Sequence, residues 1–551
     1  MLFKLNNFLK ENVKKKKEVT GFCLNKYKWS WCYYIVMKKL PIGISTLEKI
    51  INNNYVYIDK TKIALELIEN GGGYYFLSRP RRFGKSLFLD TLKEIFYGNK
   101  ELFKGLHIYD KYDFEKYPVI RISFNDGGVK CGDDLKQFIR EILEKSIKEL
   151  DLNISLGITV RESFNNVIIE TFKKYNQRVV ILIDEYDKPI LDNIDDKEIA
   201  KEIRDELKNF YSVIKGADEY LKFVFLTGVS KFSKVSLFSG LNNLNDITLN
   251  PNFSTICGYT QSELEESFKE HLKGQDLNEI RQWYNGYKWL GDSVYNPFDI
   301  LLFISNNFIY ENYWFSTATP TFLLKLIDKY RYYLPDLENI KVDNSILESF
   351  DVDNIKLETL MWQTGYLTID KTENLLNKIE YILKMPNREI EMSLLSSVAE
   401  YMTKSPTGTR HSNNMLRALL NKNMEEFETS LKALFASIAY NNFTNSEIHK
   451  YEGYYISVFY AYIKSFGVDI KNEDSTNGRI DITIMLPDTI YLIEFKIDDK
   501  HALDQIKEKK YYEKFLDTDK EIILIGIEFS TEERNVVKIE SERCKASGNL
   551  G

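Results

Sequence analysis

The sequence predicts an α/β protein of several domains, in which a parallel-sheet domain comes first and a smaller α/β unit comes last. From Met37 to Tyr259, short apolar runs alternate with longer amphipathic segments, the pattern of a parallel sheet covered on both faces. A mostly helical pattern follows, and mixed strand and helix patterns return near His449. At 551 residues the chain is too long for one core. We expect domains at 37–259, 260–445 and 446–540, with a tail at 541–551.

Composition excludes several classes of protein. The net charge of -7 argues against a protein that coats DNA through a global basic field. The five cysteines and five histidines are dispersed, which fits neither a zinc site nor a disulfide framework and suggests a reducing cytoplasm. No apolar run reaches the roughly 18 residues of a membrane span. Any nucleic-acid contact would need local basic surface, for which the candidates are Lys507, Lys509, Lys510, Arg79, Arg81 and Arg82.

The first 36 residues stand apart. A lysine run, Lys14 to Lys17, precedes the aromatic patch "YKWSWCYYIV", and this order does not match a secretory signal. Two interpretations stay open. Residues 1–36 are an N-terminal extension, or the working protein begins at Met37.

The stretch "SRPRRFGKS" (78–86) predicts a phosphate-binding loop. It follows the apolar strand 74–78 and opens a helix at Lys85, so loop N–H groups and a helix N-terminus supply positive potential. Gly84 belongs to this nucleotide-binding loop. Lys85 would reach the terminal phosphates, and Ser86 would hold Mg²⁺. Arg79 occupies the place of the usual first glycine, so a basic helix N-terminus without special role is the alternative.

A second strand, "VVILIDE" (179–185), ends in an acidic pair. Ligands of open α/β sheets bind at the carboxyl ends of strands, so Asp184 would hold Mg²⁺ through water and Glu185 would polarise an attacking water. The alternative is a simple helix cap. A third strand (222–229) has Thr227 near its end and is followed by Ser230. These two residues either sense the γ-phosphate or belong to an ordinary polar loop.

Residues 478–497, "GRIDITIMLPDTIYLIEFKI", predict a hairpin with charges on one face. A turn centred on Pro487 and Asp488 gives paired residues whose numbers sum to 975, which sets Asp481 opposite Glu494. Lys496 shares that face because strands repeat every two residues. A three-residue loop would break the cluster, and an exposed salt-bridged face is the alternative interpretation.

Two carboxylates about 5 Å apart repel each other unless a cation lies between them. Hard oxygen ligands suit Mg²⁺ or Mn²⁺, and Lys496 would orient a nucleophile or neutralise the transition state. Glu452, near the start of the predicted helix 451–463, could add a third acidic ligand. Gln505 opens a basic amphipathic helix, which with Tyr511 and Tyr512 could hold a phosphate backbone.

These motifs resemble a known family. "PIGISTLEKI", "YVYIDKT", "RPRRFGKS", "LIDEYDKPI" and "LTGVSKFSKVSLFSGLNNL" are similar to the AAA-ATPase-like domain of a bacterial and archaeal family, whose P-loop also lacks the first glycine. "WYNGYKW", "YNPFDIL" and "YWFSTATPTFLL" continue the resemblance. Residues of about 449–530 are similar to the PD-(D/E)XK nuclease domain that ends those proteins, although Ile480 replaces the proline.

The resemblance implies a P-loop NTPase domain, a helical middle region and a restriction-endonuclease-like domain. It implies ATP and Mg²⁺ as cofactors and hydrolysis of nucleic acid, which we expect to be DNA. Asp481, Glu494 and Lys496 match the D…E-x-K core, Glu452 the acid of the first helix, and Gln505 the residue of the following helix. A regulatory ATPase whose nuclease-like domain binds without cutting is the alternative. Modules of this kind often need a neighbouring subunit, so a homo-oligomer also stays open.

Overall fold

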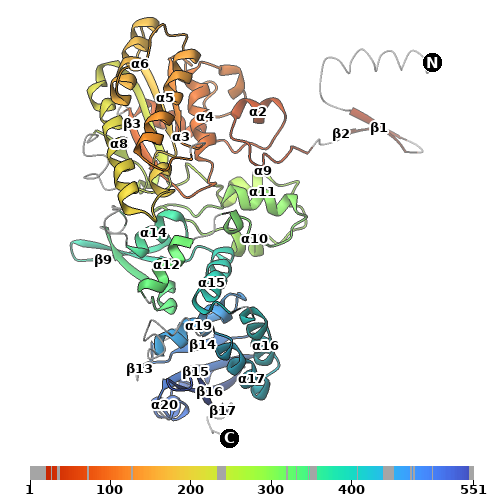
Figure 1. Cartoon of the computed structure of the whole chain (residues 1–551). Helices are drawn as coiled ribbons and strands as arrows, with labels where there is room; N and C mark the ends of the chain where they lie inside the picture. Colours follow the sequence, from red (N-terminus) through yellow and green to blue (C-terminus); the bar gives the residue numbers. More distant parts are fainter. Residues whose placement is uncertain are drawn as a thin grey trace.

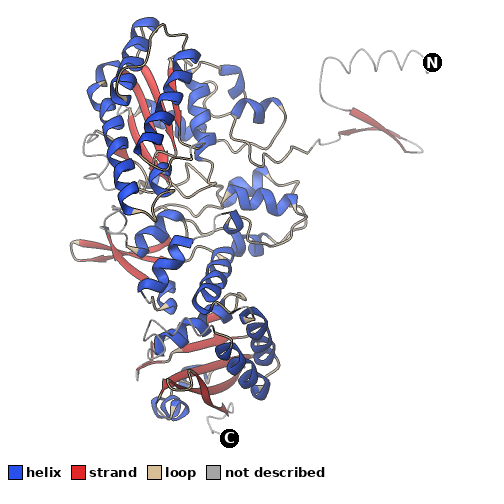
Figure 2. Cartoon of the chain, viewed as in Figure 1, coloured by secondary structure: helices blue, strands red, loops and turns tan. Residues whose placement is uncertain are grey.

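The structure is a computed structural model of the chain (Figures 1 and 2). It describes residues 20–25, 28–33, 37–70, 73–125, 128–231, 243–317, 321–330, 332–344, 347, 356–405, 407–438, 452–471, 474–475, 478–498 and 501–544.

A five-stranded parallel sheet forms the core of the first domain, as predicted. Its strands are β3 (Tyr74–Ser78), β4 (Val119–Ser123), β5 (Val179–Asp184), β6 (Leu221–Gly228) and β7 (Asn245–Asp246). The order is β4-β5-β6-β3-β7, with every pair parallel. Because β6 lies between β3 and β5, the carboxyl ends of these three strands meet at one edge of the sheet.

Helices cover both sides of this sheet (Figure 2). They are α2 (Leu47–Asn52), α3 (Thr61–Glu69), α4 (Lys85–Phe96), α5 (Gly132–Glu149), α6 (Val160–Tyr175), α7 (Lys188–Leu191) and α8 (Lys197–Gly216). Helix α8 illustrates how the sequence determines where such a helix begins and which face it buries. Its cap, Asp196, accepts hydrogen bonds from the N–H groups of Glu198 and Ile199, and its buried side chains recur at helical spacing.

The middle region is mainly helical, as predicted. Its helices are α9 (Gln261–Ser267), α10 (Leu277–Tyr284), α11 (Pro297–Ser305), α12 (Thr321–Tyr330), α14 (Leu357–Thr364), α15 (Arg388–Thr403), α16 (Gly408–Leu420) and α17 (Met424–Ala436). The region also contains an antiparallel sheet that was not predicted, with the strands β8 (Ile340–Asp343), β10 (Lys378–Lys384) and β9 (Thr368–Leu375) in that order. Most of β9 is exposed or half-buried on both faces, so it lacks the alternation that marks a strand.

The C-terminal domain is a mixed five-stranded sheet with a buried helix. Its sheet has the order β11 (Asp469–Lys471), β14 (Ile482–Met485), β15 (Thr489–Ile497), β16 (Glu521–Ser530) and β17 (Asn535–Cys544). Only β15 and β16 pair in parallel, and α20 (Ala502–Lys509) connects them. Helix α19 (Glu452–Lys464) is apolar on nearly every side and buried from Tyr454 onward.

The C-terminal domain is fastened to the middle region through α15, α16, α17 and α19 (Figure 1). The hydroxyl of Tyr491 donates to the carbonyl of Leu419 at 2.6 Å, which ties β15 to α16. Lys464 of α19 forms 3.0 Å ion pairs with Glu391 of α15 and with Glu338. Helices α16 and α17 therefore pack with a domain that we expected to begin only at residue 446.

Residues 1–36 contribute one described feature, an antiparallel hairpin of β1 (Thr20–Asn25) and β2 (Lys28–Tyr33). Among the described residues, no helix has both the length and the apolar character that crossing a bilayer requires.

Candidate nucleotide and nuclease sites

The hairpin of β14 and β15 has the predicted register. Ile482 pairs with Ile493 and Met485 with Ile490, so paired numbers sum to 975. The turn closes with the N–H of Leu486 donating to the carbonyl of Thr489 at 2.8 Å. Asp481 lies one residue before β14, and its Oδ2 accepts a 2.8 Å hydrogen bond from the N–H of Phe495. This bond holds the Asp481 carboxylate beside Glu494.

Glu494 is the centre of the cluster and is 2 % exposed. Its Oε1 accepts hydrogen bonds from Lys496, at 3.1 Å, and from the amide of Gln505. Its buried Oε2 has no hydrogen-bond partner among the described residues. Burial, and after it the negative charge of Asp481, raises the pKa of Glu494 to about 7. The site thus contains a carboxylate that is costly to ionise without an added cation.

Lys496 interacts with acidic residues from separate segments of the cluster. Burial would lower its pKa, but Glu494, Glu452 and Asp481 together outweigh burial and raise it. Glu452, half-buried in the first turn of α19, therefore lies close enough to act on the same lysine. The structure thus gathers Asp481, Glu494, Lys496, Gln505 and Glu452 from four separate segments.

The cluster fits a divalent cation in its chemistry. Carboxylate oxygens are the ligands that Mg²⁺ and Mn²⁺ prefer, and the unpartnered Oε2 of Glu494 is an open ligand. Among the described residues, no three acidic, histidine or cysteine side chains are already grouped as a metal cage. Instead, Asp481 accepts a hydrogen bond from the N–H of Phe495, and Glu494 accepts hydrogen bonds from Lys496 and Gln505.

The raised pKa of Glu494 predicts a pH dependence. The folded protein binds this proton more tightly than the unfolded chain does, so metal-free protein should lose stability as the pH rises from about 4.5 through about 7. Mg²⁺ affinity should change in the opposite sense, strengthening by about tenfold per pH unit up to about 7, because the ligand must first lose its proton. Thermal melts in EDTA of the parent and of Glu494→Gln measure the first effect. The prediction would be contradicted if the melting temperatures of the two proteins changed with pH in the same way.

Gly526 permits the close approach of α20, the helix that carries Gln505, and this role was not predicted. Gly526 lies beside Glu494 in the parallel register of β15 and β16, and a Cβ there would come within 2.3 Å of the N atom of Leu503 in α20. We expect Gly526→Ala to push α20 away, costing about 1–3 kcal/mol of stability and separating Gln505 from Glu494. Urea denaturation measures the loss. Gly216→Ala, whose Cβ would meet no atom within 4 Å, should not lower stability, because alanine favours the helix that ends there.

The expected phosphate-binding role of two tyrosines is wrong. Tyr511 and Tyr512 are 2 % and 8 % exposed and pack in an apolar cluster with Phe515. The lysines of this segment are also partly compensated, because Lys507 pairs with Glu542 at 2.7 Å. Aromatic side chains in a core cannot stack on a nucleic acid, so the basic surface here is smaller than expected.

The phosphate-binding loop joins β3 to α4, as predicted. Gly84 caps α4 with a φ of +94°, a conformation that favours glycine. Lys85 is buried, and its Nζ donates to the carbonyls of Arg79, at 3.0 Å, and Pro80, at 2.9 Å. Gly84, Lys85, Ser86 and Glu185 line a pocket of about 360 Å³.

Arg79, expected to bind nucleotide, is fully buried instead. Its guanidinium donates to the carbonyls of Ser78, Thr248 and Phe253 at 2.8–3.2 Å and lies 4.2 Å from the ring centre of Trp289. Burial lowers its pKa to about 10. A nucleotide could therefore contact only the backbone of Arg79. The buried side chain instead holds the loop in place through its hydrogen bonds to the three carbonyls.

Asp184 and Glu185 lie at the carboxyl end of β5. Asp184 is 1 % exposed, and neither carboxylate oxygen finds a hydrogen-bond donor in the described part of the chain. A buried carboxylate in this state fits a hydrated Mg²⁺. Burial raises the pKa of Glu185, while Lys85 and Arg81 oppose the rise. Both residues stand where the sequence placed them.

Thr227 and Ser230 serve the structure in this geometry. Thr227 donates to the carbonyl of Leu77 at 3.0 Å, and Ser230 donates to buried Asp187 at 2.5 Å. Asp187 also accepts from the N–H groups of Val229 and Ser230. Both hydroxyls are buried and already engaged, which favours the polar-loop interpretation over sensing of the γ-phosphate.

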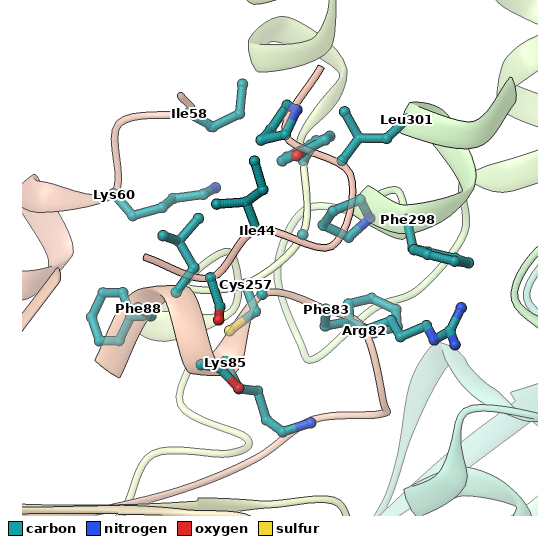
Figure 3. A pocket seen from close by; sticks show the side chains of 18 of the residues that line it. Ile44, Ile58, Lys60, Arg82, Phe83, Lys85, Phe88, Cys257, Phe298 and Leu301 are labelled. Atoms are coloured by element: carbon teal, nitrogen blue, oxygen red, sulfur yellow. The ribbon is translucent and has the colours of Figure 1, made fainter. Parts of the chain in front are cut away.

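Much of the apolar wall of the pocket comes from segments outside the phosphate-binding motif, although Phe83 of the motif also contributes (Figure 3). Ile44 and Ile58 precede the loop in sequence, whereas Cys257, Phe298 and Leu301 follow the sheet. Apolar walls beside a phosphate loop suit the base and ribose of a nucleotide. These residues were not predicted as part of the site because they carry no phosphate chemistry and lie far apart in the chain.

The fold and these sites define a P-loop protein joined to a restriction-endonuclease-like domain. Two family models agree: residues 41–238 match "Predicted AAA-ATPase" and residues 450–539 match "PD-(D/E)XK nuclease superfamily". The chain is also 46% identical over 511 residues to "Uncharacterized protein in vnfD 5'region" of Azotobacter chroococcum mcd 1, covering 91% of this chain and 98% of that protein. The chain belongs to this family of AAA-ATPase-like proteins that end in a PD-(D/E)XK nuclease domain.

Proposed function

We propose that this protein binds and hydrolyses ATP with Mg²⁺ and cuts nucleic acid, most readily DNA, at the cluster around Glu494. The observation that carries the nuclease half is the buried Glu494 carboxylate, with one oxygen unpartnered among the described residues and Asp481 and Lys496 beside it. A structural salt bridge would not leave an ionisable oxygen buried and unsatisfied.

Each residue of the cluster has a role. Asp481 and Glu494 would hold Mg²⁺ or Mn²⁺, with Glu452 nearby as a further acid. The bound ion would lower the pKa of a water and offset charge on the scissile phosphate. Lys496 orients the attacking water or neutralises developing charge, and Gln505 fixes the Glu494 carboxylate.

In the ATPase half, the loop before α4 binds the phosphates and Lys85 neutralises them. Ser86 and Asp184 would hold the Mg²⁺ that accompanies the nucleotide, and Glu185 polarises the attacking water. The unpartnered buried oxygens of Asp184 support this assignment.

The second candidate is a regulatory ATPase whose nuclease-like domain binds nucleic acid or protein without cutting. The hydrogen bonds that occupy Asp481 and one oxygen of Glu494 favour it, because they must rearrange before a metal binds.

One experiment separates the two functions. The full-length protein is incubated with supercoiled plasmid, single-stranded DNA or RNA, in Mg²⁺ or Mn²⁺, with and without ATP. Metal-dependent cleavage supports the nuclease and identifies its substrate. Binding of a substrate with ATP hydrolysis but no cleavage in either metal supports the regulatory function.

A further inference from the structure

Glu528 is a buried acid of β16 to which the proposed nuclease mechanism gives no role. Its side chain is 5 % exposed. The parallel register of β15 and β16 places it beside Lys496, so its side chain lies on the face of the sheet that also carries Glu494. Its Oε1 accepts a 2.8 Å hydrogen bond from the N–H of His501, the residue that precedes α20. This carboxylate therefore holds the main chain at the start of α20.

His501 begins α20 in a backbone conformation that needs support. Its φ is +90°, in the left-handed region that favours glycine, and its side chain does not cap the helix. The imidazole Nδ1 instead lies 3.0 Å from Oδ2 of Asp504 at the surface. Glu528 does the work of a cap, because it binds the N–H of His501 and sets a negative charge beside the positive end of the helix dipole.

The start of α20 is connected directly to the proposed metal ligands. The carbonyl of His501 accepts a 3.1 Å hydrogen bond from the N–H of Gln505, one helical turn later. The side-chain amide of Gln505 in turn donates to Oε1 of Glu494. A continuous series of hydrogen bonds thus runs from Glu528 on β16 through the first turn of α20 to Glu494 on β15. Groups that orient a ligand in this way affect how tightly the metal binds.

The connection between β15 and α20 is attached to β16 at its other end as well. The N–H of Asp498 donates to the carbonyl of Phe529 at 2.9 Å, and its Oδ1 accepts a 2.9 Å hydrogen bond from the N–H of Thr531. These bonds fix the end of β15. The bond from His501 to Glu528 fixes the beginning of α20, so it is the one that bears on the helix carrying Gln505.

We propose that Glu528 is a positioning residue of the nuclease cluster, which sets Gln505 against Glu494 by holding the N–H of His501. The inference rests on the proposed nuclease function and deepens it. In this role the carboxylate contacts neither the metal nor the nucleic acid. Glutamine can replace it, because the side-chain carbonyl of glutamine also accepts a hydrogen bond, whereas alanine cannot.

Hydrogen exchange of the metal-free, full-length protein provides the first test. We expect Glu528→Ala to speed amide exchange in the first turn of α20 by about five- to tenfold, the equivalent of one lost hydrogen bond. Glu528→Gln should exchange like the parent. Glu533→Ala, which removes an exposed acid from the turn after β16, is the matched control and should change nothing. Exchange in Glu528→Ala as slow as in the parent would overturn the proposal.

A double variant tests whether the effect passes through Gln505. We expect Glu528→Ala to weaken Mn²⁺ binding, measured by calorimetry, and to lower the kcat of cleavage, each by about tenfold. Glu528→Gln should restore both. In a Gln505→Ala background, Glu528→Ala should cause no further loss, because the amide that it positions is already gone. Losses that multiply would show a general effect on stability and would overturn the proposal.

The two experiments also separate this proposal from the proposed nuclease function. A parent that neither binds Mn²⁺ nor cuts nucleic acid would refute the nuclease function. The exchange experiment would still decide whether Glu528 holds the start of α20, because it needs neither metal nor substrate.

Discussion

Lys496→Met is expected to reduce nucleic-acid cleavage by about 10²–10³-fold while leaving metal binding intact. Its ammonium lies 3.1 Å from Glu494 and would stabilise charge in the transition state. Asp481→Asn should abolish cleavage and also weaken metal binding, because it removes a ligand. Initial cleavage rates and calorimetric Mn²⁺ titrations, both well above the pKa of Glu494, measure the two effects.

The controls for this prediction lie on the same domain. Lys471→Met and Asp517→Asn each remove an exposed charge of the same type and should cut like the parent. The roles assigned to the cluster would be contradicted by equal losses of metal binding in Lys496→Met and Asp481→Asn, or by normal cleavage in either.

Lys85→Ala is expected to weaken ATP binding by about 2–5 kcal/mol, the usual effect of removing one partner from a desolvated charge pair. Lys85 is 5 % exposed and lines the pocket at the start of α4, where it is the cation best placed for the phosphates. Titration with a fluorescent ATP analogue measures the change, and hydrolysis should fall with it.

Lys62→Ala provides the control for Lys85→Ala, since Lys62 is exposed on α3. Because Lys85 also ties the carbonyls of Arg79 and Pro80, a melting curve must accompany each titration. A folded Lys85→Ala protein that binds ATP like the parent would place the nucleotide elsewhere.

Local chemistry made the hairpin predictable. Pro487 and Asp488 fix the turn, the turn fixes the register, and the register brings Asp481 beside Glu494. The phosphate loop was predictable for the same reason, since the glycine and lysine before α4 have a direct phosphate chemistry. In both cases a short stretch of sequence determines the geometry.

Long-range contacts explain what the sequence did not reveal. The burial of Arg79 depends on carbonyls of Thr248 and Phe253 and on Trp289, all distant in the chain. A charged residue in a loop is expected to be exposed to solvent when those partners are not known. The same holds for Gly526, whose importance depends on the close approach of Leu503.

The most direct test of the account is the conversion of supercoiled plasmid by the full-length parent and by Asp481→Asn, in Mg²⁺ and in EDTA. The account predicts that the parent alone nicks or linearises the plasmid, and only with Mg²⁺. Equal cleavage by both proteins would show that the activity does not come from the Glu494 cluster. No cleavage by a parent that still hydrolyses ATP would contradict the nuclease assignment and favour a regulatory ATPase.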